Sequence, residues 1–408
     1  MTPINRLLPM NAPDLDNVVA PDIAPARTAR LICFGVFLGA LTFGVLLPVV
    51  PLYVHDTLGF GTLVVGTAVG AQFLATVLTR SIAGRRADHR GAKRTMCAGL
   101  VSCVVAGGVY VASATAPAGP GARLALLVAA RLLSGLGESQ LVTGALAWGI
   151  GTLGATRSGR VLSWTGMALY GAIALGAPCG MALARAGGLA AVAGATIVLP
   201  CIALALVATL PAVAPQPGLR VPLSRVLRII ARPGCSLALQ GVGFAAIGAF
   251  VTLLFQARGW EGAGLALSCF GGAFVLVRVL FGHLPDRFGG YPVALAALAV
   301  EAIGQLLLWA APASGVALVG ATVSGLGCSL VFPALGVATL RHVPAQARGT
   351  ALGGFTAFQD VAYACTGPLA GWVVARTDYP SAFAVGACAA FAGVLLTAWL
   401  MHADRSPP

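Results

Sequence analysis

Charged side chains are scarce in this sequence of 408 residues, because Asp, Glu, Lys and Arg make up only 9% of it. Soluble proteins carry about 25% of these residues, so the composition excludes the two or three soluble domains that the length alone would suggest. The chain is instead 58% hydrophobic, with 54 glycines. Glycine is more frequent in membrane helices than in soluble ones, and the sequence therefore predicts a protein with many membrane spans.

Several chemical motifs are also missing. The chain has no phosphate-binding loop, no HExxH and no GxSxG, so we expect neither an enzyme nor ATP-driven chemistry. Its ten cysteines lie singly in apolar runs without a CxxC pair, and we expect small buried hydrophobic side chains rather than disulfides or a metal site. The net charge of +13 comes from short dispersed clusters, which does not indicate nucleic acid as a partner. We expect no cofactor and no metal.

Twelve apolar runs follow a first segment rich in Pro and Asp. Each run can cross about 30 Å of hydrocarbon as a helix, and helix is required because backbone groups in lipid must pair within the segment. The sequence therefore predicts an all-α membrane protein with twelve transmembrane helices. The runs are Ala29–Pro51, Leu63–Ile82, Thr95–Ala114, Leu124–Leu146, Val161–Ala184, Leu189–Leu210, Cys235–Phe255, Ala263–Gly282, Pro292–Ala311, Gly315–Thr339, Thr350–Val374 and Phe383–Met401.

A hydrophilic stretch near the middle divides the runs into two sets of six. We expect a mobile cytoplasmic tail at 1–28, six-helix halves at 29–210 and 235–401, a cytoplasmic linker at 211–234 and a short tail at 402–408. If both ends are inside, nineteen basic residues lie on the cytoplasmic side and four outside. Because cytoplasmic loops are enriched in Lys and Arg, this asymmetry places both termini in the cytoplasm.

The two halves contain repeated motifs. Gly84-x3-Asp88-x2-Gly91 recurs as Gly282-x3-Asp286-x2-Gly289 at an offset of 198, and an arginine, Arg80 or Arg278, precedes each copy by four residues. Ser134-Gly-Leu-Gly137 recurs at 324–327, and Pro178 recurs as Pro368, both at an offset of 190. Parallel repeats of this kind are typical of transporters whose halves rock about a central site.

The repeated loop resembles the cytoplasmic signature of the major facilitator superfamily, G-x3-D-[RK]-x-G-[RK]-[RK], although His89 and Ala92 depart from it. The resemblance implies a conformational latch in which the Asp accepts hydrogen bonds at a helix N-terminus; an ordinary tight loop is the alternative. The latch residues would be Gly84, Asp88, Gly91, Lys93, Gly282, Asp286 and Arg287.

A second motif resembles the antiporter signature of helix five in this superfamily. Small residues four apart allow helices to approach closely, and simple packing explains much of the pattern. Its residues are Gly171, Gly176, Pro178 and Gly180, with Gly367 and Pro368 in the second half. Pro48–Asp56, Val331–Gly336 and Thr366–Gly371 are similar to the YhhS-type branch, a group loosely associated with arabinose and drug efflux.

Charges inside the predicted spans are candidates for proton coupling. A membrane arginine costs roughly 2.5–3.5 kcal/mol and needs a partner or water. Arg131 and Glu138 share one helix face about 10 Å apart, and the resemblance links Arg131 to proton coupling, with a structural clamp as the alternative. For Asp360 the sequence leaves both roles open, proton coupling and a structural charge. For Glu301 we favour a structural ion pair with Arg278, and we assign Arg80 and Arg278 as structural charges.

From the sequence and this resemblance we expect a secondary transporter of the bacterial inner membrane, a monomer that exports a small organic molecule in exchange for protons. An uptake symporter of the same fold and a membrane sensor that does not transport are the alternatives. The expected partners are the substrate, protons and membrane lipid. The resemblance implies that spans one, four, seven and ten line the substrate cavity, whose candidates are Tyr53, Gln140, Thr143, Trp148, Gln240 and Phe332.

Overall fold

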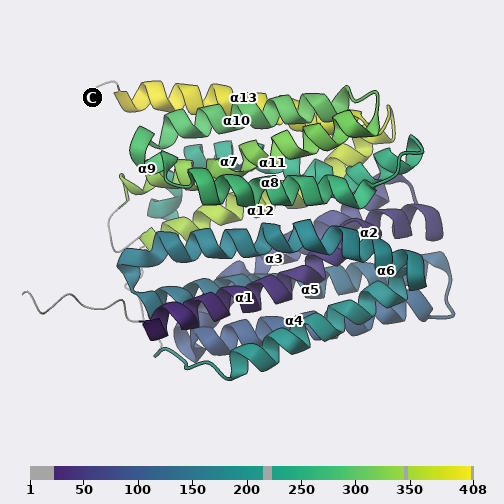
Figure 1. The fold of residues 1–408 in the computed structure, drawn as a ribbon, viewed down its shortest axis with the longest axis horizontal. Helices are drawn as coiled ribbons and strands as arrows, with labels where there is room; N and C mark the ends of the chain where they lie inside the picture. The colour runs from purple at the N-terminus through teal and green to yellow at the C-terminus, as the bar shows by residue number, and fades with distance from the viewer. Residues whose placement is uncertain (1–22, 215–222, 344–347, 406–408) are drawn as a thin grey trace, which may run out of the picture.

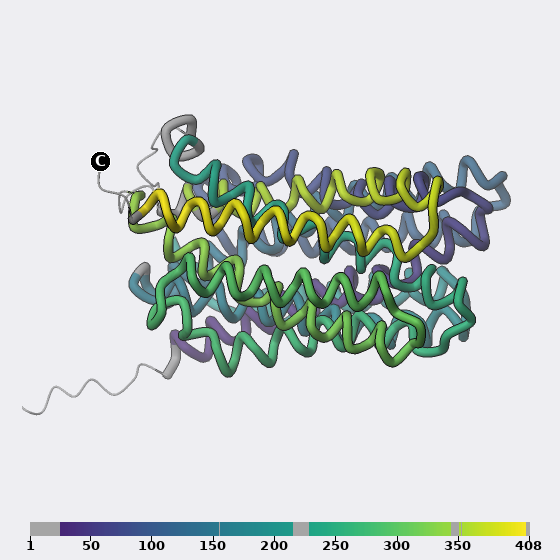
Figure 2. Tube along the Cα trace, turned by 90° about the horizontal axis from the view of Figure 1, so that it is seen from above, coloured from purple at the N-terminus to yellow at the C-terminus, as the bar shows by residue number. Residues whose placement is uncertain are grey.

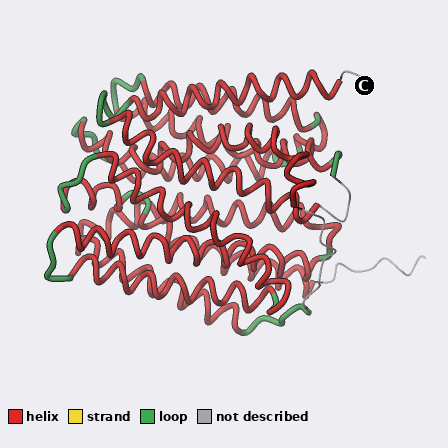
Figure 3. Tube along the Cα trace, turned by 180° about the vertical axis from the view of Figure 1, so that it is seen from behind, coloured by secondary structure: helices red, strands yellow, loops and turns green. Residues whose placement is uncertain are grey.

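The computed structural model describes residues 23–214, 223–343 and 348–405, which form helices and loops without strands (Figure 3). The expectations for residues 1–22 and for residues 215–222 of the linker lie outside these residues. Residues 223–234 of the predicted linker are instead the start of a long helix, Leu223–Ala257. The elements are α1 (Ile23–Leu46), α2 (Val49–Leu52), a π-helical turn η1 (Tyr53–Thr57), α3 (Thr62–Arg90), α4 (Ala92–Thr115), α5 (Pro120–Leu153), a 3-10 turn η2 (Ala155–Arg157), α6 (Ser158–Ala208), α7 (Leu223–Ala257), α8 (Ala263–Phe281), α9 (Leu284–Phe288), α10 (Gly290–Trp309), α11 (Ser314–Leu340), α12 (Arg348–Val374) and α13 (Ser381–Arg405).

The all-α membrane fold is confirmed, and the twelve predicted runs all correspond to helices. Two of the runs share one helix, and one run is not among the helices that qualify as candidate membrane spans. Ten helices in the described chain are long and apolar enough to cross a membrane. One of them, α6, contains both the fifth and the sixth run, and its backbone breaks at Gly187 and Gly188, where Gly188 has a φ of +61°. The eleventh run is α12, which is not among the ten but packs within the bundle against α3 and α7.

The helices form two groups (Figure 1). The first contains α1, α3, α4, α5 and α6, and the second contains α7, α8, α10, α11, α12 and α13; the main contacts between them are α3 with α12 and α6 with α8. The start of α1 and the end of α13 lie at the same end of the bundle (Figures 1 and 2). We call this the terminal end, and the opposite end, which carries η1, the far end.

Glycines allow the closest helix contacts. A Cβ on Gly66 of α3 would lie 1.9 Å from the carbonyl oxygen of Gly367 in α12, and a Cβ on Gly367 would lie 2.2 Å from that of Gly66. Between α6 and α1, a Cβ on Gly180 would lie 2.1 Å from the Val45 oxygen, and one on Gly176 would meet Gly44 at 2.8 Å. Gly171 is looser, because its nearest neighbour lies at 3.8 Å.

Each of the two prolines lies at a contact between the helix groups, close to these glycines. Pro178 is 3.2 Å from the position of a Cβ on Gly264 in α8, and Pro368 is 3.3 Å from that of a Cβ on Gly70 in α3. The small and proline residues of the helix-five pattern and of its repeat therefore surround contacts of α6 with α1 and α8, and of α12 with α3.

We predict that Gly367→Ala destabilises the protein by about 1–3 kcal/mol, the usual cost of overpacking, because backbone atoms cannot move aside as a side chain can. Gly353→Ala on the same helix is the matched control, since its Cβ would meet nothing within 4 Å and Ala favours helix over Gly. Thermal unfolding of the purified protein measures both variants. Equal shifts in the midpoint would contradict the close α3–α12 contact.

Burial of the cysteines differs from the expectation. All ten are free, but Cys179, Cys201, Cys235, Cys365 and Cys388 are exposed. Large apolar side chains such as Leu78, Val279 and Leu369 are more than 60% exposed as well. A membrane helix is apolar on its lipid face as well as on its packed face, so the apolar sequence around a cysteine does not place it in the core.

Candidate functional site

Glu138 of α5 is held by two polar side chains of α3. Its Oε2 accepts hydrogen bonds from Gln72 Nε2 at 2.7 Å and from Thr76 Oγ1 at 3.4 Å. Gln72 and Thr76 are four residues apart and therefore lie on one face of α3. Both are buried, and Glu138 is a polar group of the helix interface rather than of the surface.

Asp360 of α12 forms an ion pair with Arg80 of α3, which connects the two helix groups. Their side chains are only 11% and 17% exposed, respectively. Helical side chains point toward the helix N-terminus, so in these antiparallel helices the two side chains extend toward each other. Glu138 is close enough to Asp360 and Arg80 to interact with both electrostatically, and the structure thus gathers two predicted proton-coupling acids at one site.

Arg131 occupies a different environment from Glu138, although both are on α5. Its guanidinium donates to the carbonyl oxygens of Ala68 at 3.2 Å and Val69 at 2.9 Å in α3. The residue is 1% exposed. These contacts fit the structural clamp that the sequence left as the alternative for Arg131.

The predicted ion pair between Glu301 and Arg278 is wrong. Arg278 Nη2 donates to the Ser329 carbonyl oxygen at 2.6 Å, and its guanidinium lies 5.1 Å from the ring centre of Phe274. Glu301 Oε1 instead accepts from Gln240 Nε2 at 3.3 Å. Neither residue forms an ion pair within the described chain. Adjacent spans do not ensure a contact, because each helix has its own rotation about its axis.

Gln240 of α7 is the centre of a buried polar network. Besides Glu301, it contacts Cys328 Sγ of α11 at 2.9 Å, and its Oε1 accepts from Gln359 Nε2 of α12 at 3.0 Å. Glu301 is completely buried, with its Oε2 unpartnered, and so α10 turns this acid inward. Gln359 precedes Asp360, which places this network beside the ion pair with Arg80.

Six aromatic rings meet where the two helix groups touch, and none of them is among the predicted cavity residues. Tyr170 of α6 stacks on Phe274 of α8 with ring centres 3.7 Å apart, and its hydroxyl lies 3.2 Å from that of Tyr363 in α12. The remaining rings are Phe73 of α3, Phe244 of α7 and Phe270 of α8. The only signal in the sequence was the 190-residue offset that relates Tyr170 to Asp360.

The predicted cavity residues do not form one group. Tyr53 donates to the Ser113 oxygen at 2.8 Å near the end of α4, whereas the Trp148 ring lies 5.8 Å from Lys93 Nζ near its start. The twenty residues between these points of α4 span about 30 Å. Tyr53 is therefore at the far end and Trp148 at the terminal end.

The other predicted cavity residues lie along the helices of both groups. Gln140 accepts from Arg86 Nη1 at 3.3 Å, and Thr143 is half-buried on the same helix. Phe332 packs against Phe355 with ring centres 5.7 Å apart, inside the second group. Gln240 alone joins the central network described above.

The predicted latch loops turn at glycines. Gly91 and Gly289 have φ angles of +95° and +89°, a conformation that favours glycine. Lys93 Nζ donates to the carbonyl oxygens of Ala208 at 2.7 Å and Leu210 at 2.6 Å, where a cation suits the end of α6. A Cβ on Gly84 would meet nothing, whereas one on Gly282 would lie 2.4 Å from the Arg278 oxygen.

The acids of the predicted loops lie in helices, Asp88 in the last turn of α3 and Asp286 in α9, and both are exposed. Asp88 and Asp286 make no hydrogen bond or ion pair with any residue that the structure describes, and Arg287 lies over the neighbouring Phe288 ring at 5.3 Å. The latch contact is absent from the described residues in this conformation.

We predict that Asp88→Asn reduces transport about tenfold, the effect of losing one charge-assisted hydrogen bond, if the latch forms in the alternate conformation. Expression and the unfolding midpoint should stay at wild-type values, because Asp88 is exposed and unpaired here. Glu261→Gln, which neutralises an exposed acid in another loop, is the control. Wild-type transport by Asp88→Asn at equal expression would rule out the latch.

The far end is joined by polar contacts across the groups. Gln256 Nε2 of α7 donates to Asp56 Oδ2 at 2.8 Å. Tyr379 OH lies 3.3 Å from His55 Nε2, while His55 Nδ1 lies 3.1 Å from the Phe60 carbonyl oxygen and must donate to it. Burial, and then the Asp56 carboxylate, raises the pKa of Tyr379, so its hydroxyl can donate to His55. His55 and Asp56 thus form a polar contact between the two helix groups.

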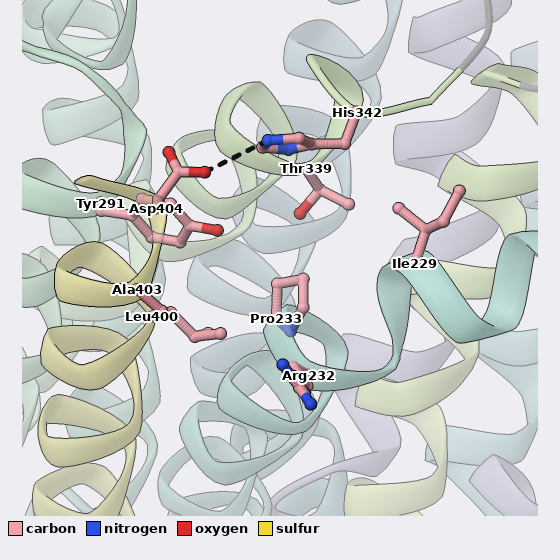
Figure 4. A pocket seen from close by; sticks show the side chains of 9 residues that line it. All are labelled: Ile229, Arg232, Pro233, Tyr291, Thr339, His342, Leu400, Ala403 and Asp404. Atoms are coloured by element: carbon pink, nitrogen blue, oxygen red, sulfur yellow. Dashed lines mark ion pairs between the residues drawn. The ribbon is translucent and has the colours of Figure 1, made fainter. Parts of the chain in front are cut away.

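A separate cavity of about 220 Å³ lies at the terminal end (Figure 4). Its lining comes from the second helix group alone, with His342 and Asp404 paired at 3.2 Å across its mouth. Both of these side chains are substantially exposed, and exposed pairs contribute little. The cavity has no contact with the central acids, and no cluster of metal ligands occurs in the described residues.

Comparison with known sequences identifies the fold family. The family model described as Major Facilitator Superfamily matches residues 32–263 and 234–408. An uncharacterized MFS-type transporter of Salmonella typhimurium strain LT2 is 44% identical over 366 residues, which cover 90% of this chain and 94% of that protein. An uncharacterized MFS-type transporter of Burkholderia mallei strain SAVP1 is 41% identical over 390 residues, which cover 95% and 96%.

Solved structures with the same fold are more distant in sequence. The D-xylose-proton symporter has a TM-score of 0.74 at 17% identity and covers 90% of this chain and 96% of its own. The nucleoside transporter NupG has a TM-score of 0.70 at 15% identity, with 93% and 100% covered. At these identities, the likeness shows the fold alone.

Proposed function

The chain belongs to the Major Facilitator Superfamily, and we propose that this multi-pass secondary transporter exchanges a small organic molecule for protons. Members of the family are transporters, so the chain is not an enzyme. The proposal rests on one observation, the Arg80–Asp360 ion pair between α3 and α12 with Glu138 beside it.

The ion pair offers a physical link between protonation and movement. Two charges removed from water are tolerated only while each compensates the other. A proton on Asp360 cancels its charge and leaves Arg80 without a partner, so the α3–α12 contact loses its electrostatic attraction. Protonation thereby changes the relative energies of conformations in which the two helix groups are together or apart.

We propose that Glu138 takes up and releases the transported proton. Its carboxylate is held only by the neutral donors Gln72 and Thr76, which bind it in either protonation state. The charges of Asp360 and Arg80 act on it in opposite senses. Breaking the Arg80–Asp360 pair therefore changes the affinity of Glu138 for a proton.

The finer assignments follow from the sequence. The helix-five pattern around Gly176 and Gly180 favours export, and the likeness at Pro48–Asp56 favours the YhhS-type branch. The ratio of nineteen basic residues to four supports our proposal that the terminal end faces the cytoplasm at a bacterial inner membrane. We propose a monomer in membrane lipid, with rocking halves at 29–210 and 235–401 joined by the linker 211–234.

The test uses the full-length protein in proteoliposomes that carry a pH gradient, a pH-sensitive dye inside and no other energy source. A panel of organic anions, neutral compounds and cations is added from either side. Dissipation of the gradient by one compound, with its movement opposite to that of the proton, supports exchange. Movement of both in the same direction would replace export with uptake symport, and substrate flux that ignores the pH gradient would refute proton coupling.

A further inference from the structure

The two arginines that precede the repeated loops have different partners. Arg80 and Arg278 are equivalent at the offset of 198, and Asp360 and Tyr170 are equivalent at the offset of 190. The structure pairs Arg80 with Asp360. At the equivalent place, Arg278 has the Tyr170 side chain nearby in place of a carboxylate. The second of two related sites therefore keeps its cation and has no anion.

The Arg278 guanidinium has hydrogen-bonding capacity to spare. Its Nη2 donates to Ser329, its Nε is enclosed without a partner, and its Nη1 makes no hydrogen bond within the described chain. Nη1 is not among the enclosed atoms, so it is open to a ligand. A guanidinium nitrogen that is open in this way can donate a charge-assisted hydrogen bond to a carboxylate.

Aromatic rings surround this guanidinium. Phe274 lies beneath it at 5.1 Å, and Tyr170 stacks on Phe274 at an interplanar angle of 18°. Phe244 meets Tyr170 edge-on with ring centres 5.6 Å apart. Tyr170 and Arg278 are both only partly buried, so this set is not a closed core. We call Arg278, Phe274 and Tyr170 the Arg278 site.

We propose that the Arg278 site binds the anionic group of the transported molecule, and that the substrate class is an organic anion with a planar aromatic portion. This inference rests on the proposed function, because a bound anion is cargo only in a transporter. The carboxylate takes the place that Asp360 holds beside Arg80, and the aromatic portion packs against Tyr170, the ring of this set that is only partly buried. A cation is excluded by the charge of Arg278, since no acid of the described chain pairs with it.

The location also explains how binding affects conformation. Tyr170 comes from the first helix group and Arg278 from the second, and the Tyr170 hydroxyl contacts Tyr363 of α12, three residues from Asp360. An anion at the Arg278 site therefore touches both groups at once. Through Tyr363 the site also contacts α12, the helix that carries Asp360 of the ion pair with Arg80.

The test measures binding of 2-naphthoate to the purified full-length protein in nanodiscs by calorimetry. The neutral 2-naphthamide has the same shape, and cyclohexanecarboxylate keeps the charge without the aromatic ring. We expect wild type to bind naphthoate about tenfold more tightly than naphthamide, the usual gain from a charge-assisted pair. Naphthoate should also bind more tightly than cyclohexanecarboxylate, which lacks the aromatic ring that packs against Tyr170. Equal affinity for naphthoate and naphthamide, or no binding of naphthoate, would overturn the proposal.

Variants assign the effect to the arginine. Arg278→Gln should remove the preference for naphthoate over naphthamide, and Arg278→Lys should retain part of it. The matched control is Arg376→Gln, because Arg376 lies over the Trp372 ring at 3.9 Å but is exposed near the far end. Loss of the preference in Arg376→Gln, or its survival in Arg278→Gln, would place the anion elsewhere.

A reciprocal variant uses the repeat. Tyr170→Asp supplies the carboxylate that this site lacks, and should abolish naphthoate binding, whereas Tyr170→Asn should keep the charge preference. Naphthoate binding unchanged in Tyr170→Asp would contradict the proposed site. The pH-gradient assay separates the two proposals: binding through Arg278 without gradient dissipation refutes proton coupling alone, and dissipation by neutral compounds that is insensitive to Arg278→Gln refutes the anion site alone.

Discussion

Glu138→Gln should abolish proton-driven accumulation of substrate while passive exchange across the membrane continues. The amide cannot take up or release a proton, but its oxygen can still accept the hydrogen bond from Gln72 Nε2 that Glu138 accepts at 2.7 Å. The local packing should therefore survive. Accumulation in proteoliposomes should fall to the level measured without a pH gradient, and exchange of labelled for unlabelled substrate should remain.

The control for this variant is Ser139→Ala, the neighbouring change on the same helix. Ser139 is buried, but its hydroxyl has no hydrogen-bond partner among the described residues, so its removal should leave accumulation at the wild-type level. If Glu138→Gln still accumulates substrate with a normal pH dependence, the proton site moves to Asp360. If Asp360→Asn were also silent, proton coupling would be removed from the proposed function.

Removal of one partner from the Arg80–Asp360 pair should destabilise the protein, and removal of both charges should restore much of the loss. A single partner left in a buried site costs about 3–5 kcal/mol. We expect about 3 kcal/mol for Asp360→Asn, because side-chain exposures of 17% and 11% allow some water to reach the remaining charge. The double variant Arg80→Gln with Asp360→Asn leaves no uncompensated charge and should unfold near the wild-type midpoint.

Transport separates this pair from a merely structural one. The double variant should be stable but insensitive to a pH gradient, since neither side chain can then change its charge. Thermal unfolding and gradient-driven uptake on the same preparations measure the two effects. Additive stability losses in the double variant would show that the two charges do not interact, and gradient-driven transport by the stable double variant would exclude them from coupling.

The buried charged residues could be identified as candidates from the sequence, but their contacts could not. Asp360 and Glu138 were identified as candidates because acids are rare in apolar runs and expensive in lipid. Their common location was not predictable, because Arg80 and Asp360 are separated by 280 positions. For Glu301 the sequence predicted a contact that does not form. Its helix and that of Arg278 are successive spans, yet the Glu301 side chain accepts a hydrogen bond from Gln240 on α7.

The sequence by itself determined the number and position of the apolar runs, their helical state, the repeated loops and the absence of enzyme motifs. These properties depend on local composition and on the requirement that backbone groups in lipid pair within each segment. The tertiary structure alone decided which faces meet: the Gly66–Gly367 contact, the aromatic rings around Tyr170 and the unpaired guanidinium of Arg278. Helices that are apolar on every side carry little information about their rotation, so the partner of each buried polar group is set only when the helices pack.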